Sequence, residues 1–369
     1  MKMKFLNSFQ VLFLAAISLS SCSKNDLMET HEFPFNTLLN IKEINTGFII
    51  SGIKDSRITI SKLTVNLSPV WQKDNYEWGK LYSEGGGGGA IYSVEVIDIF
   101  QNENGNFVCF CSVTEGGDVI WHSVLIVTLD KFGNEINKIE IERTSLLSVI
   151  RTNDDGYLLF GGKLIKLNSD LSKAWESNAQ NYIFSGAYGS PLDKNGFAIT
   201  GTWNSEQVYL QKFSGIGVLQ WTKKSYNPKA FNDLGYDVHQ LADKGFLIIG
   251  RTRAHIEPWD MNCFLIRTDM AGDTIWTKKF GTESNEWLEK ILYASDNDFI
   301  IKETVGYPND LIKKTIIVRI DGDGQIKDSK ETSFIKLLYT TSGYFVKVEK
   351  TGDDIMTFSK VQLNDLFSK

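Results

Sequence analysis

A repeated seven-residue segment constrains the fold of this chain more than any other feature. In each copy a turn residue, in most cases glycine, precedes an aromatic residue (one place later in the second copy) and apolar residues. The seven copies occupy residues 46–52, 104–110, 155–161, 195–201, 244–250, 297–303 and 342–348. Their turn residues are 58, 51, 40, 49, 53 and 45 residues apart, spacings typical of propeller blades.

Further β-rich runs surround each copy of the repeat. One follows it, as in residues 123–130 (SVLIVTLD), and another precedes it, as in residues 92–99 (YSVEVIDI). In most copies a third run comes after the one that follows the repeated segment, and it often carries tryptophan. Short β-rich runs bounded by turn residues are typical of strands. The pattern therefore predicts an all-β chain that forms a single β-propeller, with seven four-stranded blades and with six or eight as alternatives.

The two ends of the chain are predicted to close the ring together. The seventh unit ends at Lys369 without a tryptophan-bearing outer strand, while residues 31–36 (HEFPFN) precede the first unit. We therefore expect residues 31–36 to supply the fourth strand of the last blade.

The motif Asp269-x-x-Gly272-x-x-x-Trp276 is the clearest form of the third run. With the glycine-aromatic segments, it resembles the units of a loosely defined group of secreted bacterial and archaeal propellers. It is also similar to the tryptophan motif of quinoprotein-type propellers. The resemblance covers nearly all of the mature chain and implies that these tryptophans dock one blade onto the next. It concerns the scaffold, and a shared scaffold does not transfer function.

The N-terminus has the features of a bacterial lipoprotein signal. Lys2 and Lys4 precede an apolar stretch, and Leu19-Ser20-Ser21-Cys22 resembles the lipobox, in which the cysteine is acylated after cleavage. The following Ser23–Asp26 is similar to the surface-export signal of Bacteroidota lipoproteins. We expect a signal peptide at 1–21, a lipidated Cys22 with a tether at 22–30, and a propeller at 31–369. An ordinary signal peptide is the alternative.

Composition excludes some classes of partner. The net charge is −6 and the sequence contains no basic run, so nucleic acid is not expected as a partner. The predicted contact with a membrane is the lipid on Cys22, at the outer membrane and on the cell surface, with a periplasm-facing position as the alternative. Cys109, Cys111 and Cys263 are interpreted as small buried apolar residues.

No local motif indicates catalysis, a metal or a cofactor. An EF-hand reading of Asp321–Asp328 fails because Ile326 stands where glycine is needed and Thr332 where glutamate is needed. That stretch is interpreted as a turn, in which Gly324, like its counterparts Gly133 and Gly272, adopts positive φ. The four histidines show no metal-ligand spacing: His31, His122, His239 and His255. The Gly85–Gly89 run is predicted to be a connection between blades.

Three aromatic residues fall outside the repeated pattern. In units four to six they lie in the connection between the repeated seven-residue segment and the β-rich run that follows it. These are Trp203, Trp259 and Tyr307. Acidic residues lie near them in the sequence: Glu206, Glu257 and Asp260. Equivalent connections emerge on one face of a propeller, so this rim is our hypothesis for a ligand-binding surface. The alternative is that the aromatic residues cap the blade edges.

The sequence thus favours a non-catalytic binding or scaffold module for a protein or a glycan. An extracellular carbohydrate-active enzyme, either a glycosidase or a polysaccharide lyase, is the alternative. A cofactor-bearing quinoprotein is a weaker third reading.

Overall fold

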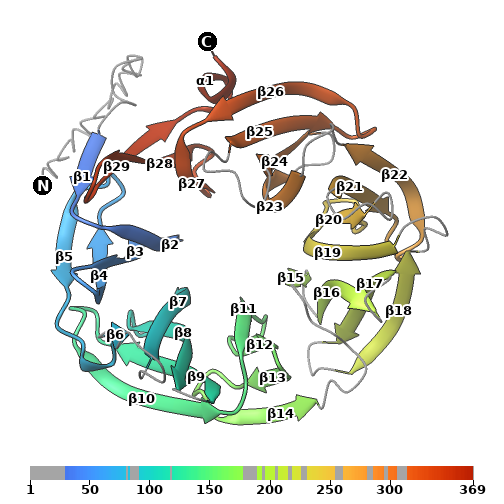
Figure 1. The fold of residues 1–369 in the computed structure, drawn as a ribbon. Coiled ribbons are helices and arrows are strands. Elements are labelled where there is room, and N and C mark those ends of the chain that lie inside the picture. The colour runs from blue at the N-terminus through green and yellow to red at the C-terminus, as the bar shows by residue number, and fades with distance from the viewer. Residues whose placement is uncertain are drawn as a thin grey trace, which may run out of the picture.

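The computed structural model describes residues 30–79, 82–83, 91–116, 119–177, 189–192, 196–203, 207–214, 218–225, 231–253, 261–280, 286–294, 298–305 and 314–368. Within these ranges, 29 strands form seven antiparallel sheets that are arranged as blades around a ring (Figure 1). The prediction of an all-β, seven-bladed propeller is therefore confirmed.

Each blade is built from an inner, a second, a third and an outer strand. Blade 1 contains β2 (Thr37–Ile44), β3 (Gly47–Lys54), β4 (Arg57–Leu63) and β5 (Pro69–Lys73). Blade 2 contains β7 (Ile91–Gln101), β8 (Phe107–Gly116), β9 (Ile120–Leu129) and β10 (Glu135–Glu142), and β6 (Tyr82–Ser83) adds a fifth strand beside β7. Blade 3 contains β11 (Leu146–Arg151), β12 (Tyr157–Gly161), β13 (Leu164–Leu167) and β14 (Lys173–Ser177).

The remaining four blades follow the same order. Blade 4 contains β15 (Gly189–Leu192), β16 (Gly196–Trp203), β17 (Gln207–Ser214) and β18 (Leu219–Ser225). Blade 5 contains β19 (Phe231–Gln240), β20 (Phe246–Arg253), β21 (Met261–Thr268) and β22 (Thr274–Phe280). Blade 6 contains β23 (Glu286–Ala294), β24 (Asp298–Val305), β25 (Lys314–Asp321) and β26 (Ile326–Thr332). Blade 7 contains β27 (Phe334–Tyr339), β28 (Phe345–Gly352), β29 (Ile355–Val361) and β1 (Thr30–Phe33).

The hydrophobic core is divided among the seams between blades. Each of the seven clusters of buried apolar residues draws its members from two neighbouring blades. The aromatic residue at the start of each second strand is at most 1% exposed: Phe48, Phe107, Tyr157, Phe197, Phe246, Phe299 and Phe345. A strand with a seam on each face is buried on both sides, which explains why the repeat reads as a nearly continuous apolar run.

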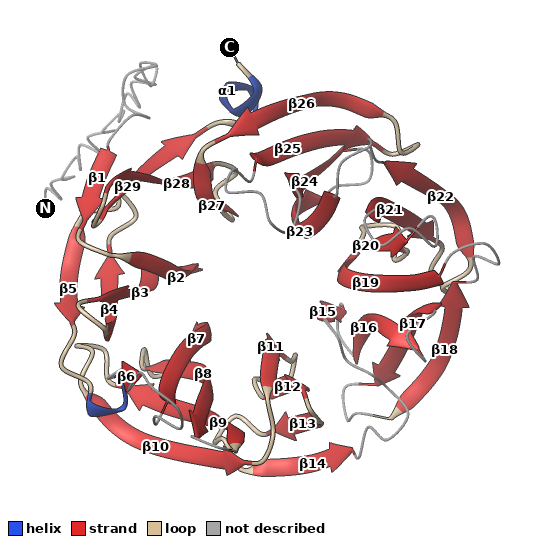
Figure 2. Ribbon diagram, in the orientation of Figure 1, coloured by secondary structure: helices blue, strands red, loops and turns tan. Residues whose placement is uncertain are grey.

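The N-terminal strand closes the ring, as predicted. β1 pairs antiparallel with β29, from Thr30 opposite Ser359 to Phe33 opposite Met356, so the two chain ends share blade 7 (Figure 2). The strand covers Thr30–Phe33 instead of 31–36, and Phe35, which follows it, is fully buried against blades 7 and 1. A short helix, α1 (Leu363–Phe367), follows β29 and was not predicted.

At several seams a tryptophan of one blade packs on a glycine of the next. A Cβ atom on Gly133 would lie 2.7 Å from the Trp71 ring, and one on Gly272 would lie 2.7 Å from the Trp221 ring. The Trp71 indole N–H also donates to the carbonyl of Lys131 at 3.0 Å. The docking role that the tryptophan motif implied is therefore present.

The glycines of these turns have the predicted conformation. Gly133, Gly272 and Gly324 have φ of 83°, 82° and 77°. Asp321 closes its turn by accepting the backbone N–H of Asp323 and Gln325 at 3.1 and 2.8 Å. The carboxylate that suggested calcium thus holds a turn.

Leucine replaces this glycine where the preceding blade offers no tryptophan. Leu67 in blade 1 and Leu171 in blade 3 have φ of 66° and 69°, in the left-handed region that normally favours glycine. Leu67 is fully buried among residues of blades 7 and 1, and Leu171 packs with residues of blades 2 and 3. At the seam of blades 6 and 7, Leu366 of α1 contributes to the core instead.

Cys109, Cys111 and Cys263 are fully buried, as predicted. Burial raises the pKa of the Cys111 thiol well above its ordinary value. Among the described residues, no helix is long and apolar enough to span a membrane.

Candidate functional site

The inner strands surround a cavity of about 740 Å³ at the centre of the ring. Six blades contribute to its lining, through strands β2, β7, β11, β19, β23, β24 and β27. This volume lies within the range of small-molecule pockets. The cavity belongs to the ring as a whole, because no single blade contains more than a small part of its lining.

A β-bulge recurs in the inner strand of each of these six blades. The register between the inner and second strands shifts just before Asn40, Asp98, Ser148, Asp237, Lys290 and Lys336. Bulges turn side chains out of the ordinary alternation of a strand. Five of these six residues line the cavity, and the sixth, Asp237, directly follows the lining residue Tyr236. The repeat therefore builds a tier of polar side chains around the centre.

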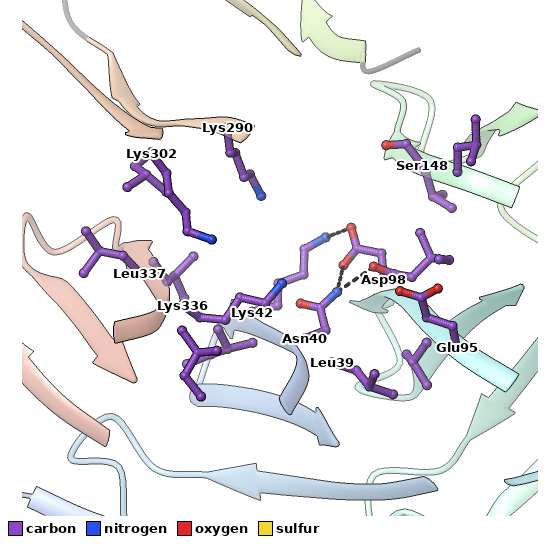
Figure 3. A pocket seen from close by; sticks show the side chains of 18 of the residues that line it. Leu39, Asn40, Lys42, Glu95, Asp98, Ser148, Lys290, Lys302, Lys336 and Leu337 are labelled. Carbon is purple, nitrogen blue, oxygen red and sulfur yellow. Dashed lines mark hydrogen bonds and ion pairs between the residues drawn. The ribbon is translucent and has the colours of Figure 1, made fainter. Parts of the chain in front are cut away.

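Four lysines give one side of the cavity a positive charge. Figure 3 shows that Lys42, Lys290, Lys302 and Lys336 extend into the same space from β2, β23, β24 and β27. Blades 6, 7 and 1 supply them, so they are neighbours around the ring. The lining also holds two carboxylates, Glu95 and Asp98, both on β7 of blade 2. The lining therefore carries a positive excess in a protein whose net charge is −6.

Lys42 links the lysines to blade 2. Its Nζ lies 2.7 Å from Asp98 Oδ2 and 3.3 Å from the centre of the Phe100 ring. Asn40 Nδ2 donates to the carbonyl of Ile97 at 2.7 Å, which fixes the neighbouring bulge. Burial lowers the pKa of Lys42, and Asp98 opposes that shift.

Lys290 and Lys302 lie directly opposite each other in the pairing of β23 with β24. Like charges at directly opposed positions of a sheet are destabilising. Asp237 of blade 5 interacts with Lys290 and accepts the Ile291 N–H at 3.0 Å, so its carboxylate fixes the strand beside Lys290. Burial raises the pKa of Asp237 to about 6, and Lys290 works against that rise.

The predicted rim lies almost entirely outside the described residues. Trp259, Tyr307, Glu206, Glu257, Asp260 and Cys22 fall outside them, as does the Gly85–Gly89 run. Trp203 is the last residue of β16, and only its backbone is described. β16, β20 and β24 each hold the second place in successive blades, so their ends lie on one face of the ring. The rim hypothesis stays a prediction.

Sequence reasoning missed both the cavity and a counterpart of the rim in blade 2. Val119 directly precedes β9, and Ile120 and Trp121 are its first two residues; they are 56%, 56% and 52% exposed. The cavity had one sequence signal. Each residue after a bulge comes seven or eight places before the turn residue of its repeat, and all six are polar or charged.

Comparisons with known proteins show the fold. A structure of BBS1N in complex with ARL6DN is similar over 90% of this chain and 95% of that chain, with 8% identity and a TM-score of 0.53. The Neurospora crassa Pan2 WD40 domain matches over 88% of this chain and 89% of its own, with 9% identity and a TM-score of 0.45. A member of the DUF4221 family from Bacteroides vulgatus matches over 90% and 96%, with 7% identity and a TM-score of 0.39.

No protein-family model matches the chain, and no curated protein matches it. At 8% identity the likeness to BBS1N concerns the fold alone. Within the described ranges, no group of three or more histidine, cysteine, aspartate or glutamate residues could hold a metal ion.

Proposed function

We propose that this chain is a lipid-anchored binding propeller that holds part of a protein or glycan partner in its central cavity. The observation that carries the proposal is the cavity of about 740 Å³ whose lining comes from six blades. A closed ring of packed sheets keeps such a lining rigid, which limits the ordering cost of binding. BBS1N, a propeller of similar architecture, was solved in complex with ARL6DN, which is consistent with a protein partner.

The arrangement of Asp98 favours binding over acid–base catalysis. Its two oxygens already take part in contacts with Lys42, Asn40 and the backbone N–H of Ile99. Glu95, the other carboxylate of the lining, is exposed, but most glycosidases use two carboxyl groups that can both reach the substrate. The carbohydrate-active enzyme is therefore the second candidate, and turnover of a bound glycan by the purified chain would make it the first.

The location is part of the proposal. Cleavage after residue 21 and acylation of Cys22 would anchor the propeller of residues 31–369 to the outer membrane, on its surface side. Mass spectrometry of the mature N-terminus tests the acylation, with Cys22→Ala as the control. Digestion of intact cells by an added protease tests surface exposure, and a protected chain would favour the periplasm-facing alternative.

The rim is proposed as an additional contact. The exposed Trp121 of blade 2 supports it, because the start of β9 lies on the same face of the ring as the end of β16, where Trp203 stands. Changing Trp203 and Trp259 together to alanine should abolish rim binding and leave the melting temperature nearly unchanged. A large loss of stability would show that these residues cap the blades.

Two matched variants test the cavity. Leu147 lines the cavity and is 42% exposed, while Leu219 lies on the outer strand β18 and is 43% exposed. Leu147→Trp should narrow the cavity and weaken binding of a ligand found by a glycan array or a pull-down with the full-length chain. Leu219→Trp should leave that binding unchanged. Equal binding by both variants would exclude the cavity as the site.

A further inference from the structure

The polar groups of the cavity are separated into two walls. Blades 6, 7 and 1 contribute the four lysines, while blades 2 and 3 contribute Glu95, Asp98 and Ser148 (Figure 3). Lysine ammonium groups donate hydrogen bonds, carboxylates accept them, and a serine hydroxyl does both. The two walls are therefore suited to bind different chemical groups of one ligand.

The lysine wall is suited to an anion. Four lysines face two carboxylates in the lining, and the nearby charges of Arg151 and Asp237 cancel each other, so an excess of two positive charges remains. A recess lined by one sign of charge and walled by protein focuses its field on an oppositely charged ligand. An anion between Lys290 and Lys302 would also relieve the repulsion of these opposed residues.

The opposite wall is suited to hydroxyl groups. Glu95 is exposed on β7, and Asp98 of the same strand also lines the cavity. A ligand with carboxylates on every side would meet repulsion from this wall. A ligand with hydroxyl groups would donate hydrogen bonds to it. The apolar residues Leu39, Leu147 and Val149 also line the cavity and offer apolar contact to a ligand.

We infer that the cavity takes a short acidic oligosaccharide, with its carboxylate groups on Lys290, Lys302 and Lys336 and its hydroxyl groups on Glu95 and Ser148. Each ring of such a ligand carries both a carboxylate and hydroxyl donors. The volume of about 740 Å³ suits a short oligomer or the end of a longer chain. This inference rests on the proposed function, because it names the ligand class of the same cavity.

Calorimetry with four probes tests the inference on the full-length chain in a neutral detergent. The probes are a trimer of galacturonic acid, the neutral galactose trimer, a triglutamate peptide and inorganic phosphate. The acidic trimer should bind, and its affinity should fall as salt rises. The neutral trimer should bind at least tenfold more weakly.

Variants of the lysines identify the site. Lys290→Gln with Lys302→Gln should weaken the acidic trimer tenfold or more, without loss of melting temperature, because the opposed charges are removed. Lys138→Gln with Lys327→Gln removes the same charge from two exposed outer strands and should leave the affinity unchanged. Equal weakening by both pairs would mean that the acidic trimer responds to overall charge, which would overturn the inference.

The remaining outcomes separate this inference from the proposed function. If triglutamate binds more tightly than the acidic trimer, the ligand class is an acidic peptide and not a saccharide. If phosphate binds with the same affinity as the acidic trimer, the cavity is a simple anion site. Equal binding of the neutral trimer would overturn the charge argument and keep a glycan site. If no probe binds, the inference fails, and the comparison of Leu147→Trp with Leu219→Trp still decides the proposed function.

Discussion

Two kinds of seam join most of the blades of this ring. Where an outer strand carries tryptophan, the next blade has glycine in contact with the ring. Trp71 packs on Gly133 in this way, and Trp276 packs on Gly324. Where the outer strand carries another residue, as Asn137 in blade 2, the next blade supplies leucine, here Leu171. The pair Trp175 and Gly217 follows the first rule in sequence, although residue 217 lies outside the described part of the chain.

The comparison shows that the seam selects the turn residue more strongly than the turn does. Left-handed backbone costs a residue other than glycine about 1–2 kcal/mol, yet Leu67 and Leu171 adopt it. Burying a leucine side chain contributes about 1.5–3 kcal/mol, which offsets that cost. Glycine is therefore kept where an indole needs the space, and it is replaced where the space would be empty.

The largest effect is expected from removing the closing strand. Deletion of residues 30–36 removes β1 and the buried Phe33 and Phe35, and should cost about 5 kcal/mol or more in the free energy of unfolding. Urea denaturation measures this loss. A chain that lacks only residues 1–29 is the control and should match the complete chain. An unchanged stability after the longer deletion would contradict closure by β1.

A methyl group in a tryptophan seam should have the next largest effect. Gly272→Ala adds a Cβ atom 2.7 Å from the Trp221 ring at a φ of 82°, and should cost about 3 kcal/mol from strain and crowding together. Gly105→Ala is the matched control, since its φ is 77° and the nearest atom would be 3.8 Å away. It should cost only about 1 kcal/mol. Equal losses of stability in the two variants would show that crowding of the Trp221 ring does not contribute to the effect.

The seam of blades 6 and 7 depends on α1 instead of a tryptophan. Leu366 is 6% exposed and packs with residues of both blades, so Leu366→Ala should cost about 2 kcal/mol. Leu219→Ala, on an exposed outer strand, should change the stability by less than about 0.5 kcal/mol. If the two substitutions have the same small effect in thermal denaturation, α1 is dispensable at this seam.

The smallest effect tests whether one kind of seam can be converted into the other. Asn137→Trp should crowd Leu171, and Leu171→Gly should leave a void; combined, they should be less destabilising than their sum by about 1 kcal/mol. A double-mutant cycle in urea measures this coupling. Asn137→Trp with Leu67→Gly, which changes a different seam, should be additive. Coupling in that second pair would contradict a local exchange of tryptophan–glycine for leucine.

The sequence contained most of the fold because the repeat is a property of single strands. The aromatic residue after each turn is buried on both faces of its strand, so Phe48 and its six counterparts mark the blades without knowledge of any neighbour. Closure by the N-terminal strand followed from counting strands. The helix α1 was missed because five residues are too few to show a helical period.

The cavity could not be predicted in the same way. Its lining depends on bulges, which break the alternation on which strand prediction depends, and on side chains that meet only when the ring is closed. Lys42 and Lys290 are separated by most of the chain, and each alone resembles an ordinary surface lysine. An alignment of the inner strands on the turn residue of each repeat would have shown Asn40, Asp98 and Lys336 at one position.

The pairing of β1 with β29 also sets an order for folding. Thr30 and Ser359 pair although they are 329 residues apart along the chain. Contacts between distant residues form slowly, because a long loop must close, with a loss of conformational entropy, before the contact can stabilise the chain. Blades 1 to 6 can assemble as the chain emerges, while β1 has no partner until β29 exists. β1, which is synthesised before the other described strands, is therefore the last to pair.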